Sequence, residues 1–106
     1  MYLLGIDVGT SGSKALLVKE SGEVVASATT EYPMFTPHPL WAEQNPEDWW
    51  GATIKSIRTT FDTAGVRPDE IASVGLTGQM HGLVLLDREG QILRPCIMWN
   101  DQRTGG

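Results

Sequence analysis

The sequence predicts an α/β fold in which three strands are followed by a helix, a further strand and a hairpin. Three short apolar runs, each bounded by glycine or other turn-forming residues, fill the first third of the 106 residues. One segment with helical spacing of its apolar residues follows, and a fourth apolar run comes after it. This sheet would have one helix to cover it, whereas layered α/β domains need cover on both faces. The chain is therefore expected to be the front part of a larger protein.

Two successive hairpins are expected at the start of the chain. The apolar run at residues 2–8 ends before a glycine and has the length of a buried strand. Five small residues at 9–13 can form a tight turn, and a second strand is expected over 15–18. Turn-forming residues at 20–23 then precede a third apolar run at 24–32.

The predicted helix has capping signals at both ends. Prolines make residues 33–46 an extended loop. Asn45 suits the N-cap, Pro46 suits the first helical position, and Gly65 suits the C-terminal end. We expect an apolar stripe to pack on the sheet, because its members recur at spacings of four and three residues: Trp50, Ile54, Ile57, Phe61 and Ala64.

The rest of the chain predicts a strand, a polar motif and a hairpin. The strand is expected over residues 73–77, and the glycine-flanked motif Gly-Gln-Met-His-Gly follows at 78–82. Apolar residues at 83–86 and 92–93 are expected to pair around a turn at 87–90.

Composition argues against several classes of function. Lys and Arg number 8 against 13 Asp and Glu, so the formal net charge is −5, and a surface for nucleic acid or for an anionic membrane is not expected. The N-terminus lacks the pattern of a signal peptide. Cys96 is the single cysteine and is expected to be a buried, inert thiol, and two histidines do not suggest a Cys/His metal cluster. A reducing, cytoplasmic setting fits this composition best.

The stretch at residues 7–14 carries the clearest chemistry. A carboxylate at the end of a buried strand needs a compensating cation or donors, so Asp7 is a candidate ligand for a metal ion or its bound water. The amides and hydroxyls of residues 10–13 can surround phosphate oxygens, and Lys14 adds positive charge. The spacing is not that of a Walker loop, which also requires a helix where a strand follows here. An ordinary Gly/Ser hairpin, with Asp7 capping its own turn, is the alternative.

Three motifs, at residues 7–14, 78–82 and 99–103, occur in the order seen in a known family. Together they resemble the FGGY family of carbohydrate kinases, and the resemblance covers essentially all 106 residues. The stretch at 38–50 is most similar to the members that act on D-xylulose. The resemblance implies transfer of the γ-phosphoryl group of ATP to a sugar hydroxyl, with Mg²⁺, on an actin-like ATPase or ribonuclease-H-like fold. The predicted β-β-β-α-β order is what the first lobe of that fold requires.

The resemblance also implies roles for individual residues. Asp7 matches the acid associated with Mg²⁺ through water, and Lys14 matches a basic position near the nucleotide phosphates. The phosphate loop is matched by Thr10, Ser11 and Gly12. The sugar-contacting pair is matched by Met80 and His81, and the second sugar-side segment by Trp99, Asn100, Asp101 and Arg103.

Several of these residues have plainer explanations. Outside its motif, Met80 would fill a core and His81 would be a satisfied loop residue. Asp101 and Arg103 could form a surface ion pair, which contributes little. Three tryptophans are expected to pack rather than to bind: Trp41, Trp49 and Trp50.

Two parts that the family requires are expected outside residues 1–106, namely the aspartate that acts as catalytic base and the second domain. The chain corresponds to the N-terminal part of the first domain, contains no catalytic base, and is expected to be inactive by itself. The expected partners are ATP and D-xylulose, and the resemblance allows a homodimer of the longer protein. The alternatives are a kinase for gluconate, ribulose or glycerol, a non-catalytic module that binds phosphate or nucleotide, and a purely structural domain.

Overall fold

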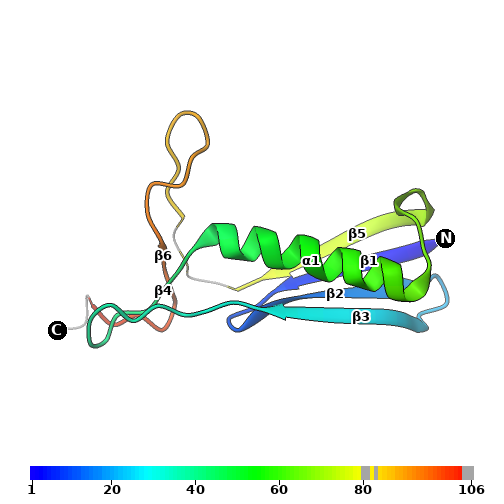
Figure 1. The fold of residues 1–106 in the computed structure, drawn as a ribbon, viewed down its shortest axis with the longest axis horizontal. Helices are drawn as coiled ribbons and strands as arrows, with labels where there is room; N and C mark the ends of the chain where they lie inside the picture. The colour runs from blue at the N-terminus through cyan, green and yellow to red at the C-terminus, as the bar shows by residue number, and fades with distance from the viewer. Residues whose placement is uncertain (80–81, 83, 104–106) are drawn as a thin grey trace.

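The computed structural model describes residues 1–79, 82 and 84–103, and its main element is a four-stranded mixed sheet (Figure 1). The sheet order is β3-β2-β1-β5, formed by β1 (Tyr2–Val8), β2 (Gly12–Lys19), β3 (Val24–Glu31) and β5 (Ile71–Gly78). Neighbouring strands are antiparallel except for the parallel pair β1 and β5, whose crossover contains the helix. The predicted β-β-β-α-β order is confirmed.

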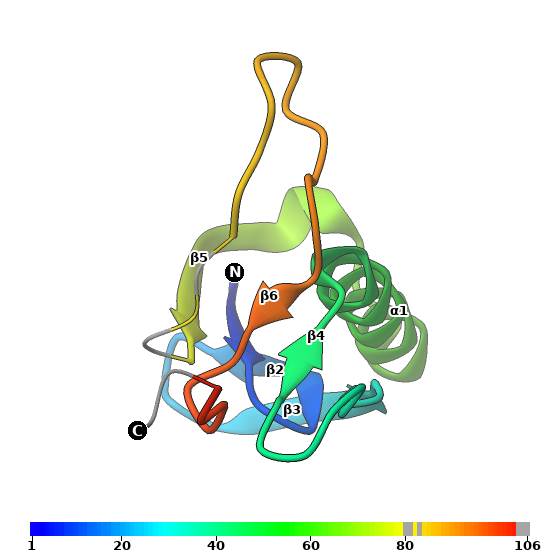
Figure 2. The ribbon, with the colours of Figure 1, turned by 90° about the vertical axis from the view of Figure 1, so that its left-hand side faces the viewer.

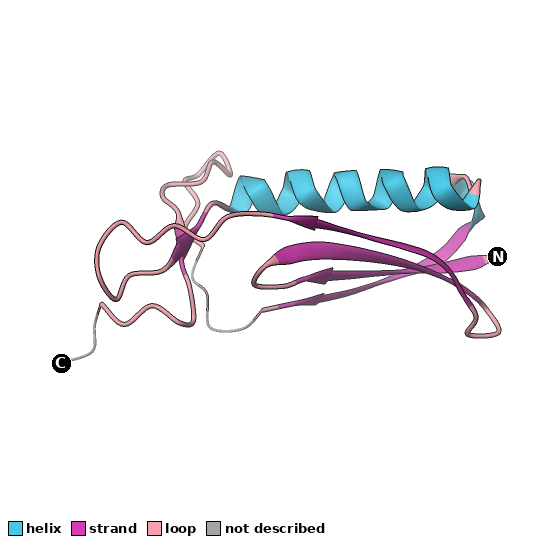
Figure 3. Ribbon diagram, turned by 60° about the horizontal axis from the view of Figure 1, so that its bottom comes forward, coloured by secondary structure: helices cyan, strands magenta, loops and turns pink. Residues whose placement is uncertain are grey.

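Helix α1 (Pro46–Ala64) begins and ends where the capping residues predict. The Asn45 side chain accepts a hydrogen bond from the backbone N–H of Glu47, and Gly65 adopts a left-handed conformation with φ of 68°. A single turn of 3₁₀ helix (Pro68–Glu70) then leads into β5. The helix lies on one face of the sheet, over β2 and β3, and the described residues place no helix on the opposite face (Figure 3).

The predicted apolar stripe of α1 is partly wrong. Trp50 is 68% exposed, and the buried residues of the helix are Ala52, Ser56 and Thr60. The buried residues of β2 are Ser13, Ala15 and Leu17, and small helical residues can approach the sheet closely where Ser13 and Ala15 lie. Hydrogen bonds satisfy the buried polar atoms: Ser56 Oγ lies 2.8 Å from the Ser13 carbonyl oxygen, and Thr60 donates to the Ser56 carbonyl.

A second, two-stranded sheet lies beyond the end of the first (Figure 2). Strands β4 (Glu43–Gln44) and β6 (Cys96–Ile97) pair in antiparallel fashion, and they were not predicted because two-residue strands carry no periodicity. Their core contains Ala42, Cys96 and Met98, against which Met34 and Trp49 pack. Cys96 is therefore buried, as predicted.

The predicted hairpin after β5 is present as a bridge between Leu86 and Ile92, and it projects away from both sheets (Figures 1 and 2). The Leu93 N–H donates to the Leu85 carbonyl, and the turn is closed by Asp87. Among the described residues, no helix has the length and apolar character needed to cross a membrane.

Candidate functional site

Three polar side chains meet where β1 ends. Asp7 is the register partner of Lys14 on β2 and of Thr77 on β5, and Thr77 Oγ1 donates to Asp7 Oδ1 at 2.9 Å. Ser13 contacts α1, so the alternation of side chains along a strand sends Lys14 and its partners to the opposite face. They line a hollow of about 520 Å³ together with the register partners Gly5 and Gly75. Asp7 is thus an exposed carboxylate with open space beside it.

The carbonyl groups of the adjoining turn, residues 9–12, each accept a hydrogen bond from within the chain. Tyr32 supplies two of the donors, because its hydroxyl donates to the Gly9 carbonyl and its backbone N–H donates to the Ser11 carbonyl at 3.1 Å. Gln44 Nε2 donates to the Thr10 carbonyl at 2.6 Å. The Gly12 carbonyl accepts from the Gly9 N–H at 2.9 Å.

These four hydrogen bonds determine the direction of the amides of the turn. In a planar trans peptide the C=O and the following N–H point in opposite directions. The N–H groups of Thr10, Ser11 and Gly12 therefore point away from the donors that hold the carbonyls of the same peptides. Successive N–H groups of a turn that share a concave side form an anion-binding site. The turn could therefore bind the phosphates of a nucleotide.

Gln44 is fully buried and contacts segments that are distant in sequence. Its Oε1 accepts from Trp49 Nε1 at 2.9 Å and from Gln79 Nε2 at 3.3 Å, while its Nε2 bonds to Thr10. Gln79 in turn lies 3.4 Å from Thr10 Oγ1 and donates its backbone N–H to Val8 at 3.1 Å. Neither Gln44 nor Tyr32 was predicted to belong to the site, because nothing local in the sequence indicates which backbone groups their side chains reach.

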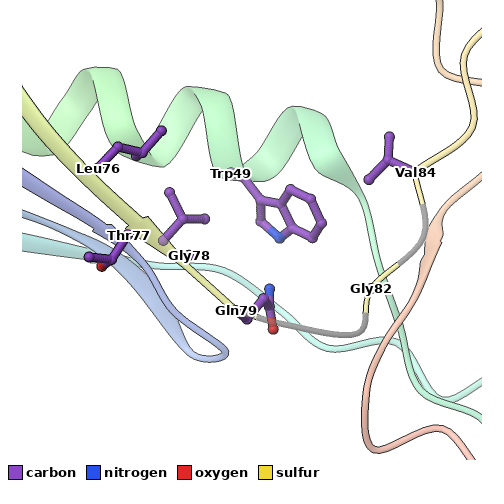
Figure 4. Close-up of a pocket in the computed structure, with 8 residues that line it drawn as sticks. Trp49, Leu76, Thr77, Gly78, Gln79, Gly82 and Val84 are labelled. Atoms are coloured by element: carbon purple, nitrogen blue, oxygen red, sulfur yellow. The ribbon is translucent and has the colours of Figure 1, made fainter.

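A second hollow, of about 420 Å³, lies at the end of β5 between α1 and the start of the projecting hairpin (Figure 4). Trp49 and Gln79 point into it, and Gly82 and Val84 lie on its far side. Met80 and His81, the predicted sugar-contacting pair, lie outside the described residues, and both of their flanking neighbours line the hollow. Trp49 packs on the small core, as predicted, and also forms a wall of this hollow.

Trp99 connects the last predicted motif to the turn at residues 9–12. It is 55% exposed, and its Nε1 donates to Thr10 Oγ1 at 3.2 Å. Thr10 is therefore contacted by Gln44, Gln79 and Trp99, which belong to three different segments. Asn100 is exposed to solvent.

Asp101 and Arg103 are not the surface ion pair that was considered, because their side chains are 2% and 13% exposed. Arg103 Nη2 lies 2.7 Å from both Asp101 Oδ2 and Glu43 Oε2. Arg94 also pairs with Glu43, and the Arg103 guanidinium stacks 3.8 Å from the centre of the Trp41 ring. We call Glu43, Arg94, Asp101 and Arg103 the ion cluster.

Both oxygens of Asp101 already accept hydrogen bonds from the chain. The Ala42 N–H donates to Oδ2 at 2.6 Å, and Arg103 donates to both oxygens. The hydrogen bonds from Arg103 hold the pKa of Asp101 well below its usual range, and Asp101 in return raises the pKa of Arg103. Asp101 therefore holds the segment at residues 99–103 against Ala42, the residue that directly precedes β4.

Tyr32 remains protonated over a wide pH range. Burial of the hydroxyl raises its pKa to about 12, and the negative charge of Asp7 adds to the shift. The hydroxyl can therefore keep donating to the Gly9 carbonyl at neutral pH.

The residues present fit a magnesium ion that is shared with phosphates. No group of three or more His, Cys, Asp or Glu that could hold a metal by themselves occurs within residues 1–79, 82 and 84–103. Mg²⁺ is usually bound by one or two carboxylates together with water and substrate phosphate oxygens. Asp7, exposed beside the turn and joined by Thr77, matches that pattern of one carboxylate.

Comparison with solved structures gives the fold class. The crystal structure of a xylulose kinase from Brucella ovis is 44% identical and matches 98% of this chain and 22% of that protein with a TM-score of 0.94. A xylulose kinase from Rhodospirillum rubrum matches with a TM-score of 0.91 at 34% identity, over 99% of this chain and 22% of that one. The fold is thus that of sugar kinases with an actin-like ATPase fold.

The sequence comparisons define the family. The model of the N-terminal domain of the FGGY family of carbohydrate kinases matches residues 2–106, and the chain belongs to this family. The xylulose kinase of Escherichia coli strain K12 is 48% identical over 97% of the chain and 21% of its own length. The chain therefore spans about a fifth of the length of the curated relatives it matches. Glycerol kinases match as well, that of Thermococcus gammatolerans at 34% identity over 97% of the chain and 21% of that relative, and that of Nitrobacter hamburgensis at 38% over 97% of the chain and 21% of that relative.

Proposed function

We propose that this chain is the N-terminal part of the first domain of a carbohydrate kinase, and that the full-length protein transfers the γ-phosphoryl group of ATP to D-xylulose, giving D-xylulose 5-phosphate. Identities of 48%, 50% and 44% to three xylulose kinases, against 34% and 38% to glycerol kinases, support D-xylulose over glycerol. The remainder of the first domain, the second domain and the catalytic base belong to the part of the protein outside residues 1–106.

The observation that carries this proposal is the turn at residues 9–12, whose carbonyls are all held by donors of the chain while its amides point away from them. Phosphoryl transfer requires positioned donors where negative charge develops, and little covalent chemistry from the protein. The amides of Thr10, Ser11 and Gly12 would bind phosphate oxygens of ATP, and Lys14 would add positive charge. A plain Gly/Ser turn requires neither the Tyr32 hydroxyl at the Gly9 carbonyl nor the Gln44 amide at the Thr10 carbonyl.

Asp7 would hold the magnesium ion, directly or through water. The ion, when bound, offsets the negative charge of the phosphates and orients them. In the reaction a sugar hydroxyl oxygen bonds to the γ-phosphorus, and the bond from phosphorus to the bridging oxygen of ADP breaks. ADP leaves, and the hydroxyl proton passes to the base, which the family resemblance assigns to an aspartate outside this chain.

The sugar would be bound beside Thr10, where two candidate segments converge. Gln79 and Trp99 both contact Thr10, and they adjoin the predicted sugar residues Met80, His81, Asn100 and Asp101. Trp99 offers an exposed flat surface for the C–H face of a sugar. A site that hydrogen-bonds each sugar hydroxyl discriminates against sugars that lack one.

The test is an ADP-release assay of the full-length protein with MgATP and a panel containing D-xylulose, D-ribulose, gluconate and glycerol. We expect the highest kcat/KM with D-xylulose and no turnover above buffer for the chain of residues 1–106 alone. A preference for another sugar would change the proposed substrate and leave the proposed kinase activity in place. Binding of MgATP without phosphorylation of any sugar would favour the alternative of a non-catalytic nucleotide-binding module.

A further inference from the structure

Gln44 combines complete burial with hydrogen bonds to three separate segments, although no sequence motif marks it as functional. The side chain has no exposed surface, and its amide bonds to the Thr10 carbonyl, the Trp49 indole and the Gln79 amide. Every one of these bonds uses a neutral group. A buried amide with its hydrogen bonds satisfied has a single preferred orientation, because any other orientation leaves a polar atom unpaired.

The indole of Trp49 sets the orientation of the Gln44 amide. Trp49 Nε1 is a donor only, so the atom of Gln44 that faces it at 2.9 Å must be the oxygen. The opposite atom, Nε2, is then directed at the Thr10 carbonyl at 2.6 Å. Trp49 thus determines which end of Gln44 meets the turn.

The bond to Thr10 controls the peptide between Thr10 and Ser11, at the centre of the turn. With the carbonyl bound to Gln44, the Ser11 N–H points the other way, toward the side where an anion would bind. Without that bond, rotation of this peptide would direct the carbonyl oxygen toward the phosphate and remove a donor. A carbonyl oxygen that faces a phosphate repels it. The orientation of this peptide therefore changes the binding free energy of an anion much more than that of a neutral sugar.

We propose that Gln44 is a positioning residue for nucleotide binding, which fixes the Thr10–Ser11 peptide with its N–H directed at the phosphates of ATP. Its second function is to link that turn, through Gln79, to the segment predicted to contact the sugar. This proposal rests on the proposed kinase function for its substrates, and the role of Gln44 itself can be measured by nucleotide binding alone.

The decisive variant is Gln44→Glu in the full-length protein. In its ionised form it keeps an oxygen that accepts from Trp49 and Gln79, and it presents an acceptor oxygen, in place of a donor, to the Thr10 carbonyl. We expect the Kd of MgADP, measured by isothermal titration calorimetry, and the KM of ATP to rise about 10-fold or more. The KM of D-xylulose is expected to stay within about threefold of wild type. The matched control is Gln91→Glu, the same change at an exposed position of the projecting hairpin, which is expected to alter neither value.

A second variant, Gln44→Met, removes the acceptor as well and introduces no charge into the buried site. It is expected to raise the KM of both substrates, because Gln79 also loses its partner. The indole N–H resonance of Trp49, observed by ¹⁵N–¹H NMR, should move upfield in Gln44→Met and remain near its wild-type position in Gln44→Glu. If Gln44→Glu does not fold, MgADP binding by Gln44→Met decides the question.

Unchanged MgADP affinity in folded Gln44 variants would overturn the proposal. A similar loss of affinity for both substrates in Gln44→Glu would also overturn it, since that pattern indicates general structural damage. If the wild-type protein binds MgADP but phosphorylates none of the sugars, the proposed function fails, and the effect of Gln44→Glu on MgADP affinity still tests the role of Gln44. If the wild-type protein binds no MgADP, both fail.

Discussion

The turn at residues 9–12 and the segment at residues 99–103 contact each other through Thr10 and Trp99, but they are held in different ways. Neutral groups fix the turn, with the Tyr32 hydroxyl and the Gln44 amide donating to its carbonyls. Charged groups fix the other segment, through the pairs that Arg103 forms with Asp101 and Glu43. The two sides of the candidate site therefore depend on different physical conditions.

This difference suits the ligands that we propose for each side. A phosphate-binding turn held by carboxylates would repel its ligand, whereas the Tyr32 hydroxyl and the Gln44 amide orient the backbone without adding negative charge. A sugar carries no net charge, so an ion cluster whose charges are paired can support its side without such a conflict. The charged support should be sensitive to acid, and the neutral support should be insensitive to pH up to about pH 10, where a tyrosine in the unfolded state begins to lose its proton.

The largest expected effect is that of Asp7→Asn on catalysis. The change keeps the shape of the side chain and removes the charge that would hold magnesium, so kcat of the full-length protein should fall about 10³-fold or more. The thermal midpoint should change by only a few degrees, because Asp7 is exposed. Asp62→Asn, the same change on the exposed side of α1, serves as the control and should leave kcat unchanged. Equal activity of the Asp7 and Asp62 variants would remove Asp7 from the site.

Gly12→Ala should distort the turn by steric contact. A Cβ at this position would lie 2.7 Å from the Thr30 carbonyl oxygen, which belongs to the backbone of β3 and cannot move away easily. We expect a loss of about 1–3 kcal/mol in the free energy of unfolding, measured with urea, together with weaker ATP binding. Gly51→Ala is the control, because nothing lies within 4 Å of its Cβ on α1, and it should stabilise the protein by about 0.5–1 kcal/mol. Similar stability of the two variants would show that β3 yields to the added methyl group.

Asp101→Asn tests the charged side of the comparison. The pKa of Asp101 is lower in the folded protein than the ordinary value of 3.8, so the ionised carboxylate stabilises the folded state above that pH, and the stabilisation is lost as the pH falls further. The variant should unfold at a lower urea concentration than wild type at pH 7. The difference in urea midpoint between the two proteins should narrow progressively below pH 4. A gap of constant size between pH 7 and pH 2.5 would mean that the hydrogen-bond geometry, and not the charge, holds the segment.

The fold could be predicted from the sequence where a local signal determines the structure. Asn45 and Gly65 identify the ends of α1, and the apolar run at residues 2–8 identifies β1, because capping and strand patterns depend on neighbouring residues. The buried face of α1 was predicted less well, because Ser56 is buried against the sheet and Trp50 is exposed. The spacing of apolar residues along the helix does not indicate which side chains fit against the sheet.

The supports of the candidate site could not be predicted, for a related reason. Gln44 lies 34 residues from the Thr10 carbonyl, and the Tyr32 hydroxyl lies 23 residues from the Gly9 carbonyl. In both cases a side chain donates to a backbone carbonyl. Every residue has a backbone carbonyl, so the sequence does not indicate which one accepts such a hydrogen bond. The candidate ligand-binding residues of the turn were recognisable as a motif, whereas the residues that orient the turn required the tertiary structure.

Tyr32→Phe is expected to have the smallest effect, and it tests the neutral groups that hold the turn at residues 9–12. Loss of the hydroxyl should cost about 1 kcal/mol near neutral pH, since it removes one hydrogen bond to the Gly9 carbonyl. The pKa of Tyr32 is raised from 10.0 to about 12 in the folded protein, so its stabilising contribution is complete below pH 10. Between pH 10 and 12 the unfolded state loses this proton while the folded state keeps it, and wild type is destabilised relative to the variant. The difference in urea midpoint between the two proteins should therefore be constant from pH 6 to 9 and shrink by pH 11. A difference in urea midpoint that already narrows below pH 6 would show that the support of the turn depends on charge.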